Sequence, residues 1–110
     1  MKRFINKTAI DSSAVTADEN SATLDFAFME TWSAHIVWTS TTAAATIKIQ
    51  ESNDGTNWVD ISGASQAISN NSGNTMLSSV DLGAQYLRVL VDHTSGTVTT
   101  LNVKVVGKGR

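Results

Sequence analysis

The stretch Thr46–Ile61, TIKIQESNDGTNWVDI, contains the clearest local signal in the chain. In its first half Ile47 and Ile49 alternate with polar residues, and this period of two is typical of a half-buried β-strand. The segment SNDG then interrupts the run. Asn and Asp favour turns because their side chains bond to the nearby backbone, and Gly accepts positive φ without a steric cost. Because Trp58 begins a second apolar run, we expect a β-hairpin with its turn at Asp54–Gly55.

Similar alternation recurs on both sides of this hairpin, and no stretch shows a convincing helical period. The positions that it predicts to face a core are Ala22, Leu24, Phe26, Phe28, Trp32, Ala34, Ile36, Trp38, Leu87, Val89, Val91, Leu101, Val103 and Val105. The intervening residues 29–31 are expected to bend the chain, residues 63–74 to form a loop, 75–82 a short strand with its turn, and 107–110 a basic tail. About seven or eight strands at such spacing predict an all-β fold, a single-domain antiparallel β-sandwich of jelly-roll type.

The first 21 residues have a weaker pattern than the rest of the chain. They are rich in Ser, Thr, Ala and Asn, with turn-like clusters at 11–13 and 18–21. A helix over residues 14–20 would be too short to stand alone. We therefore expect one domain, residues 1–110, in which residues 1–21 form a loosely structured N-terminal arm. Arg3, Phe4 and Ile5 are the candidates for docking this arm on a neighbouring subunit.

The composition limits the classes of protein to which the chain belongs. Its 110 residues, 41% hydrophobic and 16% charged, suit one domain with one core. The absence of Cys excludes disulfides and thiolate metal sites. No apolar segment follows the basic N-terminal residues, so a cleaved signal peptide is not expected. No apolar run approaches the ~20 residues that cross a bilayer, so we expect no membrane association.

Charge is distributed unevenly along the sequence. Residues 8–103 contain only Lys48 and Arg88 but all ten acidic residues, a net charge of −8, whereas the two ends together carry +6. One interpretation is that the terminal segments lie together and are solvated. The functional alternative is that basic ends bind acidic surfaces of neighbouring subunits. Nucleic-acid binding is not expected, because the basic ends lack interleaved aromatic residues and the acidic remainder would repel phosphate.

The sequence offers little support for catalysis or for a bound metal. Glu51, Asn53 and Asp54 could supply oxygen ligands to Ca²⁺, but only two carboxylates are local, the spacing is not that of an EF-hand, and a hairpin turn explains these residues better. His35 and His93 are too few for a metal centre without other ligands. Serine is abundant, yet no G-x-S-x-G motif is present to orient a nucleophile. We expect no enzymatic activity, no cofactor and no resident metal.

Two aromatic residues and one arginine are the main binding candidates. An exposed Trp58 beside the Asn53–Asp54 turn would suit stacking on a sugar ring, and Tyr86 is the second candidate. The alternative for Trp58 is that it covers the end of the core, because buried aromatic residues dominate core energetics. Arg88 has three possible partners: an acidic neighbour, the ring of Tyr86, or a second subunit.

The order of these segments resembles small virion structural proteins of tailed bacteriophages. In that group a strand ending in S-x-D-G-x-x-W precedes a strand of the form A-x-Y-x-R-V, as in IKIQESNDGTNWVDIS and LGAQYLRVLVDHTSGT here. The resemblance covers most of the chain from Ala9 onward. The same pair of motifs also occurs in discoidin-like and carbohydrate-binding sandwich modules.

The resemblance implies a capsid- or tail-associated assembly or decoration subunit without catalytic residues. Such a protein would be assembled in the host cytoplasm and located in the virion, with other virion proteins as partners. Open sheet edges and segregated charge also lead us to expect a homo-oligomer. The alternative is a carbohydrate- or receptor-binding β-sandwich module, which would present a groove with exposed aromatic residues.

Overall fold

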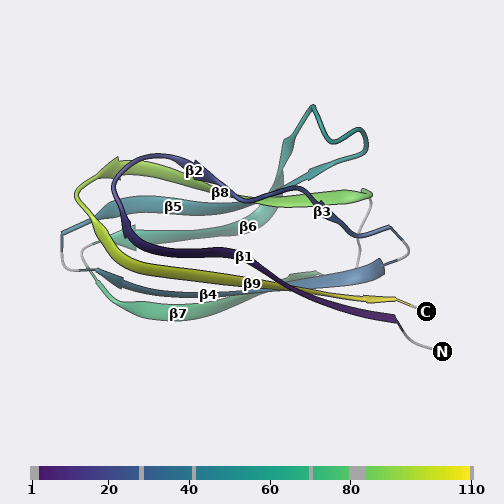
Figure 1. Cartoon of the computed structure of the whole chain (residues 1–110), viewed down its shortest axis with the longest axis horizontal. Coiled ribbons are helices and arrows are strands. Elements are labelled where there is room, and N and C mark those ends of the chain that lie inside the picture. Colours follow the sequence, from purple (N-terminus) through teal and green to yellow (C-terminus); the bar gives the residue numbers. More distant parts are fainter. Residues whose placement is uncertain (1–2, 28, 41, 70, 80–83, 110) are drawn as a thin grey trace.

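The chain folds into two antiparallel β-sheets that pack face to face (Figure 1). The computed structural model describes residues 3–27, 29–40, 42–69, 71–79 and 84–109, with the side chains of residues 3 and 79 excluded. Sheet A contains, in spatial order, β1 (Arg3–Val15), β9 (Val98–Gly109), β4 (Met29–Ser40) and β7 (Gly73–Ser79). Sheet B contains β2 (Glu19–Asn20) and β3 (Leu24–Asp25), which both pair with β8 (Tyr86–Ser95), followed by β5 (Ala44–Ser52) and β6 (Val59–Ser69).

The order of the strands is that of a jelly roll. Apart from the β2–β3 step and the β5–β6 hairpin, each strand is followed by one in the opposite sheet, so the chain crosses repeatedly between the two layers. Such double-sheet wrapping is the jelly-roll arrangement. The prediction of an all-β antiparallel sandwich of jelly-roll type is confirmed, with nine strands among the described residues. These residues include no helix that is long and apolar enough to cross a membrane.

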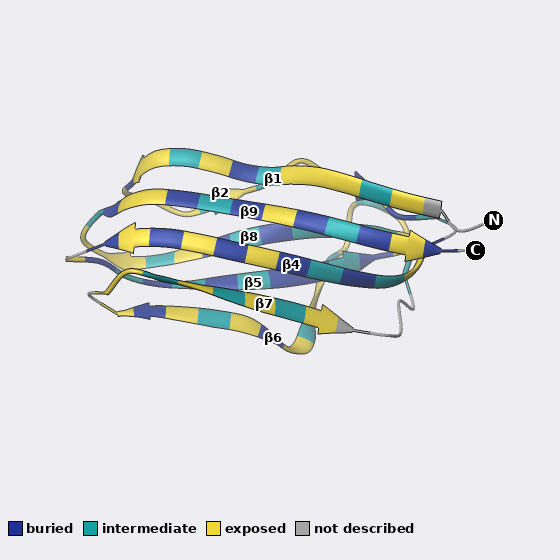
Figure 2. Ribbon diagram, turned by 90° about the horizontal axis from the view of Figure 1, so that it is seen from below, coloured by how far each residue is buried: buried dark blue, intermediate teal, exposed yellow. Residues whose placement is uncertain are grey.

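Alternating burial along the strands builds the core between the sheets. Figure 2 shows the alternation on β4 and β9, where buried and exposed residues follow one another. Twelve of the fourteen positions predicted to face the core are buried, and Phe28 lies outside the described residues. The prediction was wrong for Ala22, which is exposed because it precedes the short strand β3 instead of lying within a regular strand. Residues on one face of a strand share a side of the sheet, so this period of two is sufficient to place them.

The N-terminal segment differs from its prediction. Instead of a loosely structured arm, residues 3–15 form β1, which pairs with β9 from Arg3–Gly109 to Val15–Val98 with one irregularity. Ile10 and Val15 are buried in the chain's own core, Ile5 packs against its rim, and Phe4 is 62% exposed. The prediction of a basic tail at 107–110 was also wrong, because residues 107–109 belong to strand β9. Because β9 continues to Gly109, its backbone offers partners to β1 on one side and β4 on the other.

Three other boundaries also differ from expectation. The loop predicted at 63–74 is largely strand, because β6 runs to Ser69 and β7 begins at Gly73. The regular strand expected from residue 22 is reduced to the two residues of β3, and the bend expected at 29–31 is the irregular start of β4. The predicted strand at 75–82 corresponds to β7 as far as Ser79, and its last residues lie outside the described residues.

Candidate functional site

The loop between β5 and β6 projects from one end of the sandwich (Figure 1). Strands β5 and β6 form the predicted hairpin, with Glu51 opposite Val59. Gly55 has a φ of 74°, so the predicted turn with positive φ at this residue is confirmed. A residue without Cβ adopts this conformation at little cost, which explains the glycine at this position.

Two side chains hold this loop in shape. The Ser52 hydroxyl accepts hydrogen bonds from the backbone N–H of Asp54 at 3.2 Å and of Gly55 at 2.9 Å, and donates to Asp54 Oδ1 at 2.9 Å. Asp54 Oδ1 also accepts from the N–H groups of Thr56 and Asn57, both at 2.8 Å, while Oδ2 accepts from Asn57 Nδ2 at 2.8 Å. These bonds take the place of strand pairing within the loop.

Both oxygens of the Asp54 carboxylate therefore accept hydrogen bonds from residues of its own loop. Hydrogen bonds from Asn57, first from its backbone and then from its side chain, hold the pKa of Asp54 well below its usual range, with smaller contributions from Thr56 and Ser52. These contacts account for Asp54 as a structural turn residue rather than a calcium ligand. Among the described residues, no three His, Asp or Glu side chains gather closely enough to hold a metal ion.

Protonation of Asp54 should weaken the fold. A carboxylate whose pKa is lower in the folded than in the unfolded state stabilises the protein above its unfolded pKa of roughly 4. This contribution is lost as the pH falls toward the folded pKa. We expect Asp54→Asn to lower the melting temperature at pH 7, and the difference from wild type to shrink as the pH falls from 5 to 2.

Thermal melts at constant ionic strength would measure this convergence. Asp25→Asn is a suitable control, because Asp25 is exposed and, among the described residues, its carboxylate accepts one hydrogen bond, from the Ala27 N–H. A difference between Asp54→Asn and wild type that stays constant across this pH range would contradict the assigned role of the carboxylate.

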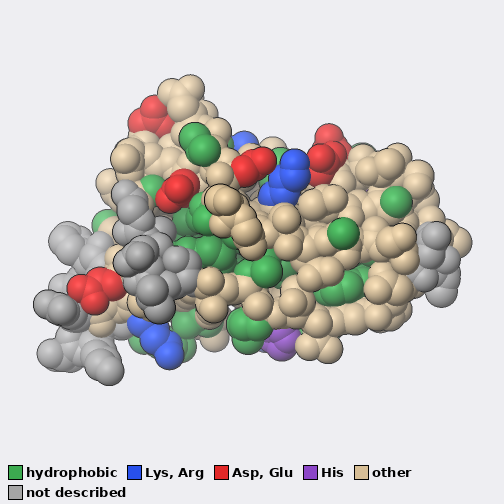
Figure 3. Space-filling model, turned by 180° about the vertical axis from the view of Figure 1, so that it is seen from behind, with side chains coloured by type: hydrophobic (Ala, Val, Ile, Leu, Met, Phe, Trp, Pro, Cys, Tyr) green, Lys and Arg blue, Asp and Glu red, His purple; other side chains and the backbone are tan. Residues whose placement is uncertain are grey.

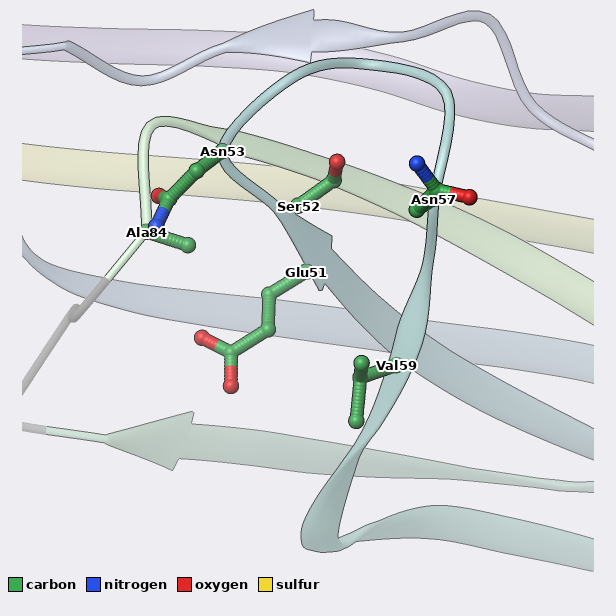
Figure 4. Close-up of a pocket in the computed structure, with 6 residues that line it drawn as sticks. All are labelled: Glu51, Ser52, Asn53, Asn57, Val59 and Ala84. Atoms are coloured by element: carbon green, nitrogen blue, oxygen red, sulfur yellow. The ribbon is translucent and has the colours of Figure 1, made fainter.

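A shallow hollow of about 310 Å³ lies beneath the loop. Its lining residues are Glu51, Ser52, Asn53, Asn57, Val59 and Ala84. Figure 4 shows the Glu51 side chain extending between Ala84 and Val59, below the loop that connects Asn53 to Asn57. Asn53 also accepts a hydrogen bond from the Gln85 N–H at 3.2 Å, which attaches the loop to the start of β8.

A line of polar side chains crosses the outer face of sheet B, from β6 over β5 to β8. Gln50 Nε2 donates to Asp60 Oδ1 at 2.7 Å, and Gln50 Oε1 accepts from Arg88 Nε at 2.7 Å. The Arg88 guanidinium then lies over the Trp58 ring, 4.6 Å from its centroid. Gln50 is only 8% exposed, and an unpaired polar group would be costly at such a buried position. Both the oxygen and the nitrogen of its amide have hydrogen-bond partners.

The contacts of Trp58 and Arg88 therefore differ from those that the sequence predicted. Trp58 is half-buried and lies under a guanidinium, instead of covering the end of the core. Arg88 stacks on Trp58 rather than on Tyr86, and its hydrogen bond reaches an acid only through Gln50. A cation–π contact of this kind contributes about 0.5–1 kcal/mol at an exposed site. Tyr86 is half-buried, and an added Cβ at Gly55 would lie 3.9 Å from its ring.

A lysine extends this polar line along the sheet. Lys48 Nζ lies 3.8 Å from Asp60 Oδ2 and 3.5 Å from Asp92 Oδ2. In Figure 3 acidic and basic side chains lie next to one another along the upper part of the molecule, near the projecting loop. Both carboxylates are more than half exposed, so each ion pair contributes at most about 1 kcal/mol.

The sequence analysis missed the residues that join this face. Gln50, Asp60 and Lys48 became neighbours of Arg88 only through strand register: Gln50 is opposite both Asp60 and Arg88, and Lys48 is next to it on the same face. One signal in the sequence could have identified part of this face: Lys48 and Gln50 are two positions apart in β5, so their side chains lie on the same face of the strand. The two histidines are not brought together, since His35 lies on β4 in sheet A and His93 on β8 in sheet B.

The basic residues of the two ends do gather, but on a sheet rather than on tails. Lys7 lies on β1, and Lys104 and Lys108 on the adjacent β9. Most of the described acidic side chains belong to sheet B or to the loops at its ends. These are Asp18, Glu19, Asp25, Glu51, Asp54, Asp60 and Asp92. Among the described residues, sheet B and its loops therefore carry most of the negative charge, although sheet B also contains Lys48 and Arg88 and sheet A also contains Asp11 and Glu30.

Several solved structures share this fold, although no protein-family model and no curated protein matches the sequence. The SPBc2 prophage-derived protein YomS has a TM-score of 0.61 at 13% identity, over 99% of this chain and 96% of that chain. The PBSX exported protein XepA has a TM-score of 0.66 at 14% identity, over 96% of this chain and 37% of XepA. A structure described as "CBM4 structure and function" has a TM-score of 0.55 at 8% identity, over 93% of this chain and 77% of that chain. At these identities the likeness is one of fold.

Proposed function

We propose that the protein is a structural subunit of a tailed-bacteriophage particle, associated with the capsid or the tail and without catalytic activity. The observation that supports this most directly is the full-length jelly-roll likeness to a prophage-derived protein, since 99% of this chain matches 96% of YomS. XepA, described as a PBSX exported protein, has a similar fold over part of its length. Fold alone does not specify function. The virion motifs of the sequence supply the second, independent support.

The arrangement of polar groups agrees with an exterior built for stability and contact. On sheet B, Gln50, Asp60 and Arg88 bond to one another, and Asp54 bonds to its own loop. Groups arranged this way stiffen a surface without requiring a ligand. The partners we propose are further copies of the chain and other virion proteins. The basic β1–β9 side and the acidic sheet B would favour some orientations of neighbouring subunits and disfavour others.

A second candidate is a carbohydrate- or receptor-binding module. It is favoured by the likeness to the structure described as CBM4 and by Trp58 and Tyr86, which lie near the polar line on sheet B. Aromatic rings beside fixed hydrogen-bonding groups suit a sugar. Titrating soluble glycans while following Trp fluorescence would test it, with Trp58→Ala as the variant. Saturable binding that Trp58→Ala removes would favour this second function.

A stop codon early in the gene would test the virion role. We expect the phage that encodes the chain to yield fewer infectious particles, or particles that dissociate at lower temperature, and expression of the protein in trans to restore them. A matched variant, Phe4→Ala, changes an exposed side chain and should complement fully. Particles of normal yield, composition and stability without the protein would overturn the proposal.

A further inference from the structure

The four sheet edges of this sandwich are not equally protected. An edge strand carries unpaired backbone N–H and C=O groups, and proteins blunt such edges with charge, bulges, proline or short strands. In sheet B, β2 and β3 have two residues each, and β6 contains Asp60 and an irregular register around Gly63. In sheet A, β1 contains Lys7 and Asp11 and a register shift between Thr8 and Ile10. Each of these three edges therefore has at least one protective feature.

Strand β7 has none of these features. Its seven residues, GNTMLSS, include no charge and no proline. Its pairing with β4 runs without interruption from Trp32–Ser79 to Trp38–Gly73, so the strand has no bulge. Among the described residues, β7 pairs with β4 alone, so its other side has no backbone pairing at the margin of sheet A, where β6 of sheet B runs alongside it in Figure 2. Met76, in the middle of the strand, is 58% exposed.

A small recess lies directly beside this open edge. It has a volume of about 120 Å³ and is lined by Trp32, Ile61, Ser62, Gly63, Ala64, Leu77 and Ser78. The recess lies between the irregular part of β6 and the inner side of β7. A strand added to β7 would point every second side chain inward, toward this recess, and the others outward beside Met76.

We propose that the open edge of β7 pairs antiparallel with β7 of a second copy of this chain, so that two sandwiches share one continuous sheet. Pairing by strand addition takes its affinity from main-chain hydrogen bonds and its specificity from side-chain pockets. A second β7 is the favoured occupant. Two copies of β7 related by a two-fold axis place no like charges opposite each other, because the strand has no charged residue, whereas like charges directly opposite would destabilise a pair. This inference specifies the self-assembly contact of the proposed structural subunit, and it replaces the N-terminal arm as the site of that contact.

Charge placed on the edge should disrupt the pair. Because Met76 is the central residue of β7, a pair centred on the strand brings the two introduced ammonium groups close together, and we expect Met76→Lys to weaken self-association at least tenfold. Val37→Lys is the matched control: Val37 is 40% exposed and faces the same side of sheet A, but lies on the central strand β4. Sedimentation velocity of the full chain at tens of micromolar should give a dimer for wild type and Val37→Lys, and a monomer for Met76→Lys.

Single cysteines provide a second measurement that does not depend on the lysine variant folding. Because the chain has no Cys, one cysteine placed in turn at Asn74, Thr75, Met76, Leu77 or Ser78 reports only on contact between copies. We expect disulfide-linked dimers under mild oxidation, with the yield highest at the two-fold position. Thr8→Cys, on the opposite edge of sheet A, should remain monomeric.

Two outcomes would overturn the inference. One is a wild-type chain that stays monomeric in sedimentation at this concentration. The other is a dimer that Met76→Lys leaves intact and that cross-links no better through β7 than through Thr8→Cys. Either result would leave the virion role open, because that role is measured on phage particles rather than on the purified chain.

Discussion

Replacing Gly96 by alanine is expected to destabilise the protein by about 3 kcal/mol or more. Gly96 lies between β8 and β9 with a φ of 71°, which is unfavourable for any residue with a Cβ. The added carbon would also overlap the backbone carbonyl oxygen of Thr42, and backbone cannot move aside as a flexible side chain can. The turn between β8 and β9 and the connection from β4 to β5 would have to separate.

Gly55→Ala is the matched control for this substitution. Gly55 has nearly the same φ, 74°, but the nearest atoms to an added Cβ are those of the Tyr86 ring at 3.9 Å, an ordinary contact. We therefore expect only the conformational cost, about 1 kcal/mol. Urea unfolding of both variants would separate the two contributions. If both variants lost the same free energy of unfolding, the contact between the added Cβ and the Thr42 backbone would not be a cause of the instability at position 96.

Removal of the Phe26 side chain should cost about 3–5 kcal/mol, the usual range for a buried Phe→Ala change. Phe26 is fully buried between the sheets, and its ring fills the space above Gly107, where an added Cβ would lie 2.9 Å from it. Its backbone is fixed as well, since its N–H donates to the Gln85 carbonyl and its carbonyl accepts from Met29. The surrounding strands thus have little freedom to collapse into the cavity.

Phe4→Ala tests the same chemistry without burial. Phe4 is 62% exposed on β1, so we expect a loss within about 0.5 kcal/mol. Chemical denaturation of the two variants gives the comparison, and Phe26→Leu provides a milder change if Phe26→Ala does not fold. A large loss in Phe4→Ala combined with a small one in Phe26→Ala would contradict the position of the core.

The sequence predicted the parts of the fold that local pattern determines. Ile47, Ile49 and Trp38 were placed correctly because alternation in a strand is a property of its own residues. The β5–β6 turn was found because SNDG has its own turn chemistry. The N-terminal strand was missed because β1 is defined by pairing with β9, nearly the whole chain away. Strand β1 is an edge strand with many polar and small residues, so its sequence shows little of the apolar–polar alternation that identifies a strand.

The candidate site shows the same limit. Asp54 was correctly recognised as a turn residue from its local sequence, and its hydrogen bonds lie within five residues of it. The contact between Arg88 and Trp58 was not predicted, because it depends on how β8 is registered against β5 and where the loop places its tryptophan. Gln50 bonds to both Asp60 and Arg88, yet a glutamine in a strand carries no recognisable motif. Strand register, rather than composition, determines this face.

The central claim is that the protein is part of a phage particle, and its presence in purified particles tests this most directly. Particles of the phage that we propose encodes the chain would be banded in a density gradient, washed in moderate salt and quantified by mass spectrometry against the major capsid protein. We predict that the protein bands with the particles at a fixed number of copies per particle through repeated banding. Recovery only as free protein in the lysate or medium, with none in the particle band, would contradict the account.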